Sequence, residues 1–95
     1  MNRAPIEVGR VVVSKAGRDR GRPFIVVGVV DDDFVMVANG ALRKMDRQKK
    51  KRRKHLKPTG RVVTELRDRL SQAKPIEDHE LRTWLSEEEE KLVQV

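Results

Sequence analysis

The stretch that decides the fold spans residues 8–30 and reads VGRVVVSKAGRDRGRPFIVVGVV. It begins and ends with short runs rich in β-branched residues, Val8–Ser14 and Phe24–Val30, which favour strands over helices. The loop between them contains Gly17 and Gly21, which can adopt positive φ, and the cations Lys15, Arg18, Arg20 and Arg22. The pattern predicts two strands joined by a basic, glycine-containing loop.

A third strand is predicted at Phe34–Ala38, after a turn at Asp31–Asp33 whose carboxylates can accept bonds from nearby backbone N–H groups. Asn39-Gly40 is a strong hairpin signal and predicts a fourth strand near Ala41–Lys44. The second and third strands are apolar at successive positions, which predicts a tightly curled barrel covered on one outer face by the C-terminal segment. Gly28, inside the second strand, predicts a bend or bulge.

The remainder of the chain has helical periodicity. Val62, Val63, Leu66 and Leu70 recur at helical spacing, and Pro75 predicts the end of that helix. A second helix is predicted from residues 77–78, with Leu81, Trp84 and Leu85 on one face. We therefore expect a mainly β (α+β) fold. Residues 1–58 form a small barrel that includes the basic segment 43–57. Residues 59–95 form a C-terminal extension of one or two short helices, packed on the barrel or trailing it.

Several function classes have no residues to support them. The chain of 95 residues suits one domain, and the absence of cysteine excludes disulfides, thiolate metal sites and cysteine nucleophiles. Asp31–Asp33 lack the spacing of a calcium loop, and no phosphate loop of the Walker type or nucleophile elbow is present. No apolar run approaches the length of a bilayer span, and the N-terminus does not resemble a signal peptide. We expect a cytoplasmic, non-enzymatic protein with no cofactor, metal, membrane partner or small-molecule substrate.

The positive charge is concentrated in one segment. The net charge of the chain is +7, residues 43–57 alone carry +9, and residues 58–95 carry −3. A partner polyanion would relieve the repulsion in such a cluster, so the segment predicts phosphate contacts with nucleic acid. Two alternatives stay open: a nuclear-import signal at residues 49–54, and a solvated face with no specific role. The candidate residues are Arg43, Lys44, Arg47, Lys49, Lys50, Lys51, Arg52, Arg53, Lys54, His55 and Lys57.

Aromatic residues are scarce, and this constrains the mode of binding. The chain contains only Phe24, Phe34 and Trp84, and both phenylalanines begin apolar strands, which predicts that they lie in the core. Base-stacking platforms are therefore poorly supported, and we expect recognition of RNA backbone and shape. The acidic run Glu87–Glu90 suggests a further hypothesis, in which it folds back and masks the basic segment, against the simpler alternative of a solvated helix.

Residues 8–22, followed by Phe24–Val30, resemble the KOW motif, a strand, a basic glycine-containing loop and a second strand. The wider run from Glu7 to Leu56 resembles small bacterial KOW-domain RNA-binding proteins, which are similar to large-subunit ribosomal protein fourteen of archaea and eukaryotes. The resemblance implies an SH3-like barrel. It also implies binding to structured RNA, rRNA or the ribosome, through Lys15–Arg22 and the basic segment, with ribosomal proteins as further partners. Because KOW modules also bind proteins, the alternative is an adaptor that docks on the translation or transcription machinery.

Overall fold

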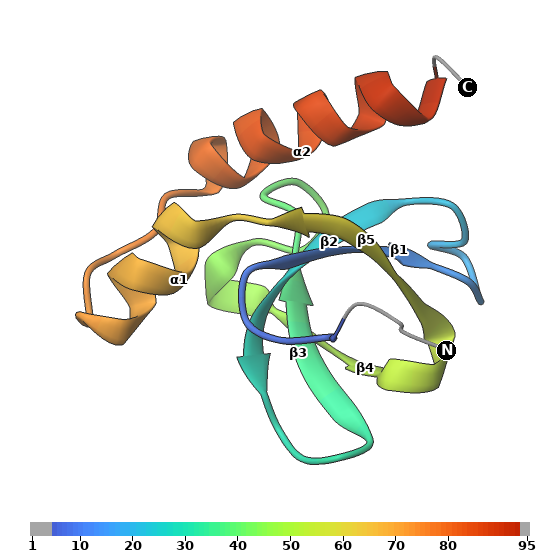
Figure 1. The fold of residues 1–95 in the computed structure, drawn as a ribbon, viewed down its shortest axis with the longest axis horizontal. Coiled ribbons are helices and arrows are strands. Elements are labelled where there is room, and N and C mark those ends of the chain that lie inside the picture. Colours follow the sequence, from blue (N-terminus) through green and yellow to red (C-terminus); the bar gives the residue numbers. More distant parts are fainter. Residues whose placement is uncertain (1–4, 94–95) are drawn as a thin grey trace.

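The computed structural model describes residues 5–93, with side chains to Glu87. Five antiparallel strands form one curled sheet in the order β4-β3-β2-β1-β5: β1 (Arg10–Ser14), β2 (Pro23–Val29), β3 (Phe34–Ala38), β4 (Lys49–Arg52) and β5 (Leu56–Val62). Single 3-10 turns, η1 (Met45–Arg47) and η2 (Arg53–His55), flank β4. Two helices follow, α1 (Thr64–Ser71) and α2 (Asp78–Val93), and α2 lies across the top of the barrel (Figure 1). The predicted fold class is confirmed.

β2 is buried on both faces over most of its length, which explains its successive apolar residues. Inside the barrel, Phe24 and Val26 of β2 pack with Val35 and Val37 of β3. On the other face, Ile25 and Val27 of β2 pack against side chains of both helices, chiefly Leu66, Leu81 and Leu85. The neighbouring residues of β2 thus belong alternately to two cores, because side chains alternate across a strand. Side chains of the C-terminal segment thus cover one outer face of the barrel.

Local backbone features agree with several predictions. The β2–β3 register shifts between Val26 and Gly28, so the predicted irregularity at Gly28 is present. In the turn before β3, Asp31 Oδ1 accepts the N–H groups of Asp33 and Phe34, both at 2.8 Å. These two bonds hold the pKa of Asp31 below its ordinary value, because they favour the ionised carboxylate.

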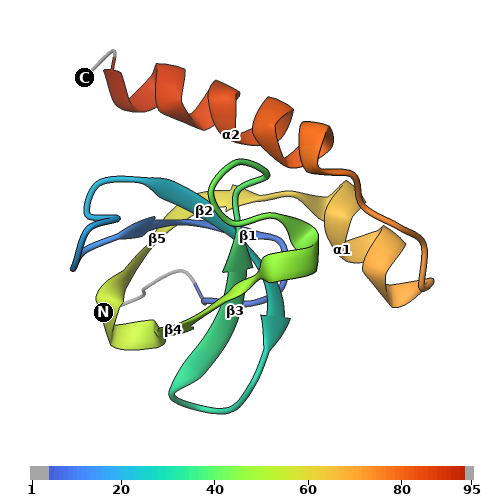
Figure 2. The ribbon, with the colours of Figure 1, turned by 180° about the vertical axis from the view of Figure 1, so that it is seen from behind.

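The predicted fourth strand at Ala41–Lys44 is wrong. Asn39 instead closes a compact loop: its Oδ1 accepts the N–H groups of Ala41 and Arg43, and its own N–H donates to the Arg43 carbonyl. The loop lies next to α2 in both ribbon views (Figures 1 and 2). The next strand to pair with β3 is β4, formed by the Lys- and Arg-rich residues 49–52. Such residues are depleted in strands, so composition did not reveal it.

The junction between barrel and helices also differs from expectation. Val62 ends β5 and Val63 precedes α1, so the first helix begins two residues later than its apolar spacing indicates. It ends where predicted, before Pro75, with Ala73 in the left-handed region at φ 56° and the Lys74 N–H bonded to the Arg69 carbonyl. The division of the chain after residue 58 remains a prediction, and β5 runs across that position.

Candidate nucleic-acid interface

The loop between β1 and β2 is closed by its own backbone. Gly21 donates its N–H to the Ser14 carbonyl at 2.8 Å, and Ser14 donates to the Arg22 carbonyl at 3.0 Å. Gly17 and Gly21 have φ values of 74° and 86°, which allow the chain to reverse tightly. Because backbone groups satisfy one another, the loop's predicted contact residues are free to face solvent, and all four are exposed: Lys15, Arg18, Arg20 and Arg22.

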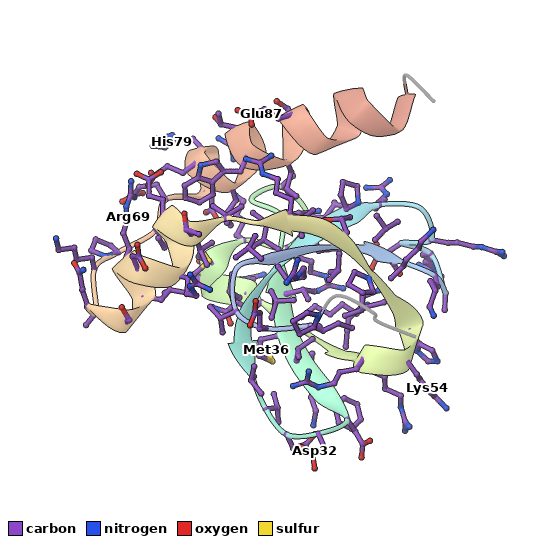
Figure 3. All side chains as sticks on the ribbon, in the orientation of Figure 1. Asp32, Met36, Lys54, Arg69, His79 and Glu87 are labelled. Carbon is purple, nitrogen blue, oxygen red and sulfur yellow. The ribbon has the colours of Figure 1, made fainter. Side chains whose placement is uncertain are left out.

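The basic segment 43–57 is ordered over its whole length, since it forms a loop, η1, β4, η2 and the beginning of β5. Most of its predicted contact residues are solvent-exposed: Lys44, Arg47, Lys50, Arg52, Lys54, His55 and Lys57. The other four are partly buried: Arg43, Lys49, Lys51 and Arg53. Figure 3 shows Lys54 at the corner between β4 and β5, on the opposite side of the molecule from Arg69 and His79. The cluster is therefore part of a folded surface.

The loop and the basic segment meet at a crevice of about 420 Å³. Its walls hold Arg18 and Arg22 from the loop, Arg43 from the turn after β3, and Lys49 from β4. These four cations come from separate parts of the chain, and the sheet brings them around one depression. Asp19 and Leu42 complete the lining, and Leu42 is 65% exposed.

Asp19 neutralises part of this charge. Its Oδ2 lies 3.3 Å from Lys51 Nζ and 3.8 Å from Lys49 Nζ. The Lys51 side chain is only 10% exposed, because it also donates to Ser14 Oγ at 3.1 Å and lies over the Phe24 ring. The Lys51 ammonium is thus bound by groups of the protein itself. The side chains of its neighbours Lys50 and Arg52 lie on the opposite face of β4, where they are exposed.

Arg53 is also engaged inside the protein. Its Nη1 donates to the Ile6 carbonyl at 2.8 Å, and its Nε donates to the Asp31 carbonyl at 3.2 Å. The side chain therefore joins the N-terminal segment to the turn before β3. A substitution of Arg53 would disturb the barrel as well as remove charge, so this residue is a poor choice for testing ligand contacts.

The expectation for the two phenylalanines is half right. Phe24 is completely buried inside the barrel, but Phe34 is only partly buried. Phe34 lies opposite Arg52 in the β3–β4 register, on the strand face away from Val35 and Val37. Lys50 Nζ lies 4.5 Å and Arg52 Cζ 5.1 Å from the centre of its ring. The apolar run Phe34–Ala38 did not reveal this, because only the pairing with β4 places cations beside the ring.

One cation near the site lies outside the segments that the sequence singled out. Arg82 of α2 lines a second crevice together with Arg22, Asn39 and Ala41, and its Nη1 donates to the Gly40 carbonyl. In the sequence Arg82 is a single cation among acidic residues of its helix. Its place beside the basic loop depends on how α2 packs on the barrel, which periodicity alone does not specify.

Glu87, the first residue of the acidic run, pairs with a cation outside the basic segment. Glu87 Oε2 lies 3.1 Å from Arg61 Nη2, and the side chains of residues 88–90 lie outside the described part of the structure.

Over the residues described, no group of three or more histidine or acidic side chains is placed to hold a metal ion. None of the helices described is long and apolar enough to cross a membrane.

Comparison with known proteins tests the predicted resemblance. No family model matches the chain. The large ribosomal subunit protein eL14 of Desulfurococcus amylolyticus is 40% identical over 58 residues, which cover 61% of this chain and 60% of the relative. The chain is similar to eL14. The eL14 proteins of Staphylothermus marinus and Pyrobaculum calidifontis are 31% and 34% identical over the same number of residues, again 61% of this chain, and 60% and 56% of the relatives. The resemblance is thereby confirmed, and the chain spans about 60% of the length of these eL14 proteins.

Proposed function

We propose that this protein is a non-enzymatic RNA-binding protein of the ribosome, which recognises the backbone and shape of rRNA. The contact surface, here called the basic surface, consists of the exposed cations of residues 15–22 and 43–57 together with the crevice between them. The similarity to eL14, named as a large ribosomal subunit protein, supports rRNA and neighbouring ribosomal proteins as the partners. No site residue proposed here has a catalytic role.

The crevice is the observation that carries the proposal. Arg18, Arg22 and Arg43 present guanidinium groups, which bind phosphate oxygens bidentately, and Lys49 adds a point charge. A phosphate backbone can follow such a depression between two basic edges, whereas a disordered tail or an import signal needs no fixed arrangement of cations. The basic segment 43–57 includes β4, which is a strand of the sheet, and it shares the crevice with the β1–β2 loop. The spacing between its charges is therefore defined by the fold.

Salt dependence measures how much of the binding is electrostatic. If five to eight phosphates are engaged, log K should fall against log salt concentration with a slope of roughly −4 to −7, or less steeply for single-stranded RNA. The full chain is titrated into purified large-subunit rRNA at several salt concentrations. A salt-independent affinity would contradict the proposed phosphate contacts.

Charge reversal locates the contacts. Replacing Arg18 and Arg43 together by Glu should weaken rRNA binding and flatten the salt slope by about one to two units. The matched control replaces Arg67 and Lys74 by Glu, because both are exposed and lie outside the basic surface. The net-charge change is the same in both variants. Equal losses of affinity would show that total charge matters and that the crevice does not.

A protein-docking adaptor is the second candidate, and two exposed valines favour it. Val29, the last residue of β2, is 53% exposed, and Val30, which follows it, is 47% exposed. An adaptor that used this apolar patch would bind a protein partner with little salt dependence, and the complex would survive nuclease treatment. Sedimentation with large ribosomal subunits before and after nuclease treatment separates the two candidates. Replacing Val29 and Val30 by Ser would release an adaptor from its partner.

A further inference from the structure

We propose that a groove beside β4 binds one unpaired nucleotide of the RNA, with its base stacked on Phe34 and Arg52. This inference rests on the proposed RNA-binding function and adds a subsite for a base to a surface otherwise suited to phosphates. The groove, here called the β4 groove, has a volume of about 410 Å³. It is lined by Ala16 and Gly17 of the β1–β2 loop, Phe34 of β3, residues 49–52 of β4, and His55.

The stacking surface is the first argument. Phe34 and Arg52 are paired across β3 and β4, so their side chains share one face, with the Arg52 guanidinium 5.1 Å from the ring centre. Arg52 is exposed and Phe34 is half-buried. Aromatic rings and guanidinium planes are the surfaces on which proteins stack unpaired RNA bases. Here one of each stands at the wall of the same groove.

Open space within the groove is the second argument. Ala16 and Gly17 contribute almost no side chain to the groove. A Cβ built on Gly17 would meet no atom within 4 Å, so the backbone there borders open solvent. The volume of the groove lies within the range of about 300–1,000 Å³ that small-ligand sites occupy. A base can therefore enter beside Phe34 without displacing the loop.

Charge at the rim is the third argument. Lys50 is exposed, and its ammonium lies 4.5 Å from the centre of the Phe34 ring. A base that stacks on the ring takes the place of this ammonium, and the flexible Lys50 side chain can then reach the phosphate of the same nucleotide. His55 lies at the same rim and offers ring nitrogens for hydrogen bonds. Lys51 is excluded from this role because Asp19 and Ser14 hold its ammonium.

The groove is continuous with the crevice that carries the proposed function. Lys49 lines both depressions, so an RNA strand whose phosphates lie between Arg18 and Arg43 passes directly to the edge of β4. A duplex has no free base to insert at that edge. A bulged or looped nucleotide does, and we therefore assign the β4 groove to an unpaired position within structured RNA.

The test compares two RNA hairpins with the same stem, one fully paired and one with a single bulged 2-aminopurine. The variant Phe34→Leu keeps the apolar contact and removes the ring. It should weaken binding of the bulged hairpin about 5- to 100-fold, the range expected for loss of one base stack, and leave the paired hairpin unaffected. Wild-type protein should also quench the 2-aminopurine fluorescence. Phe34→Tyr should restore both the affinity and the quenching.

The outcomes separate this inference from the proposed function. If neither hairpin binds, the RNA-binding function itself is wrong. If both bind wild type and Phe34→Leu alike, or the fluorophore stays unquenched, only the stacking site is wrong. If Phe34→Leu does not fold, the site is tested instead by crosslinking the wild-type protein to a hairpin that carries 4-thiouridine at the bulged position. A crosslink to residues 33–36 or 49–55 supports the site, and one elsewhere overturns it.

Discussion

The backbone of Gly40 lies directly against the carbonyl group of Asp78, the first residue of α2. Gly40 has a φ of 76°, and a Cβ at this position would overlap the Asp78 carbonyl oxygen. The contact is reinforced by Asp78 Oδ1, which accepts the Met45 N–H at 2.8 Å, and by the Arg82 bond to the Gly40 carbonyl. The beginning of α2 thereby fixes the loop that presents Arg43 to the crevice.

Replacing Gly40 by Ala should destabilise the protein by about 2 kcal/mol or more, since the new methyl group adds a steric overlap to an unfavourable φ. The control is Gly17→Ala, which has a similar φ of 74° but open space around the new atom, and should cost about 1 kcal/mol. Urea denaturation of both variants gives the comparison. Equal losses would show that α2 does not press on this loop.

The pair Lys51–Asp19 should contribute to stability, because both side chains are largely shielded from water. In a double-mutant cycle with Lys51→Met and Asp19→Asn, we expect a coupling free energy of about 0.5–3 kcal/mol. Lys54→Met serves as the control for Lys51→Met, since Lys54 is exposed, and its effect should stay within about 0.5 kcal/mol. Zero coupling would show that Asp19 does not hold the Lys51 ammonium, and Lys51 would then again be a candidate RNA contact.

The contact between α1 and α2 should weaken in acid. Arg69 Nη1 donates to Glu80 Oε1 at 2.7 Å, and this bond holds the pKa of the Glu80 carboxyl below its ordinary value of 4.5. A lowered pKa in the folded state means that the stabilisation is complete above pH 4.5 and disappears as the pH falls through the folded-state value. Arg69 stays protonated throughout, and Glu80 raises its pKa further.

The measurement compares the Tm of wild type with that of Glu80→Gln over a pH series. The difference should be constant near neutral pH and should shrink below pH 4.5. Glu77→Gln is a suitable control, because Glu77 is an exposed carboxylate in the same turn. A Tm difference that is independent of pH down to strong acid would show that the ionised Glu80 is not what stabilises the contact.

Ala73→Gly should stabilise the protein, unlike most substitutions. Ala73 has a φ of 56°, where a residue with a Cβ is disfavoured by about 1–2 kcal/mol relative to glycine. Part of that gain is offset, because glycine gives the unfolded chain more freedom, so we expect a net increase of up to about 1 kcal/mol. The measurement compares the Tm of Ala73→Gly with the Tm of Ala73→Ser, a control that keeps a Cβ at this position. A lower Tm for Ala73→Gly would contradict the expected gain in stability.

The sequence predicted the strands and helices whose residue types or apolar spacing are typical of those elements. β-branched runs marked β1, β2 and β3, and apolar spacing with Pro75 marked α1 and the start of α2. It missed β4 because its residues are all Lys or Arg, and β5 because Pro58-Thr59-Gly60 reads as a break. β5 tolerates Pro58 because it is an edge strand, so one side of its backbone needs no partner.

The candidate site was predictable as a set of cations but not as a surface. Strand alternation separates exposed Lys50 from engaged Lys51, and only the register with β3 shows which is which. The same register places cations around Phe34, a residue whose apolar neighbours pointed to the core. Arg82 joins the site through packing of α2. Each of these depends on contacts between residues far apart in sequence, which local patterns do not encode.

β4 ends the sheet, and within residues 5–93 no strand lies beside its outer backbone edge. Such an edge is a template on which a second sheet can grow, and proteins protect it by placing charge there. Two copies of the Lys-Lys-Lys-Arg strand would repel each other as they approached edge to edge. The residues proposed to attract RNA therefore also oppose self-association of the free protein, and they should keep it soluble before any polyanion is bound.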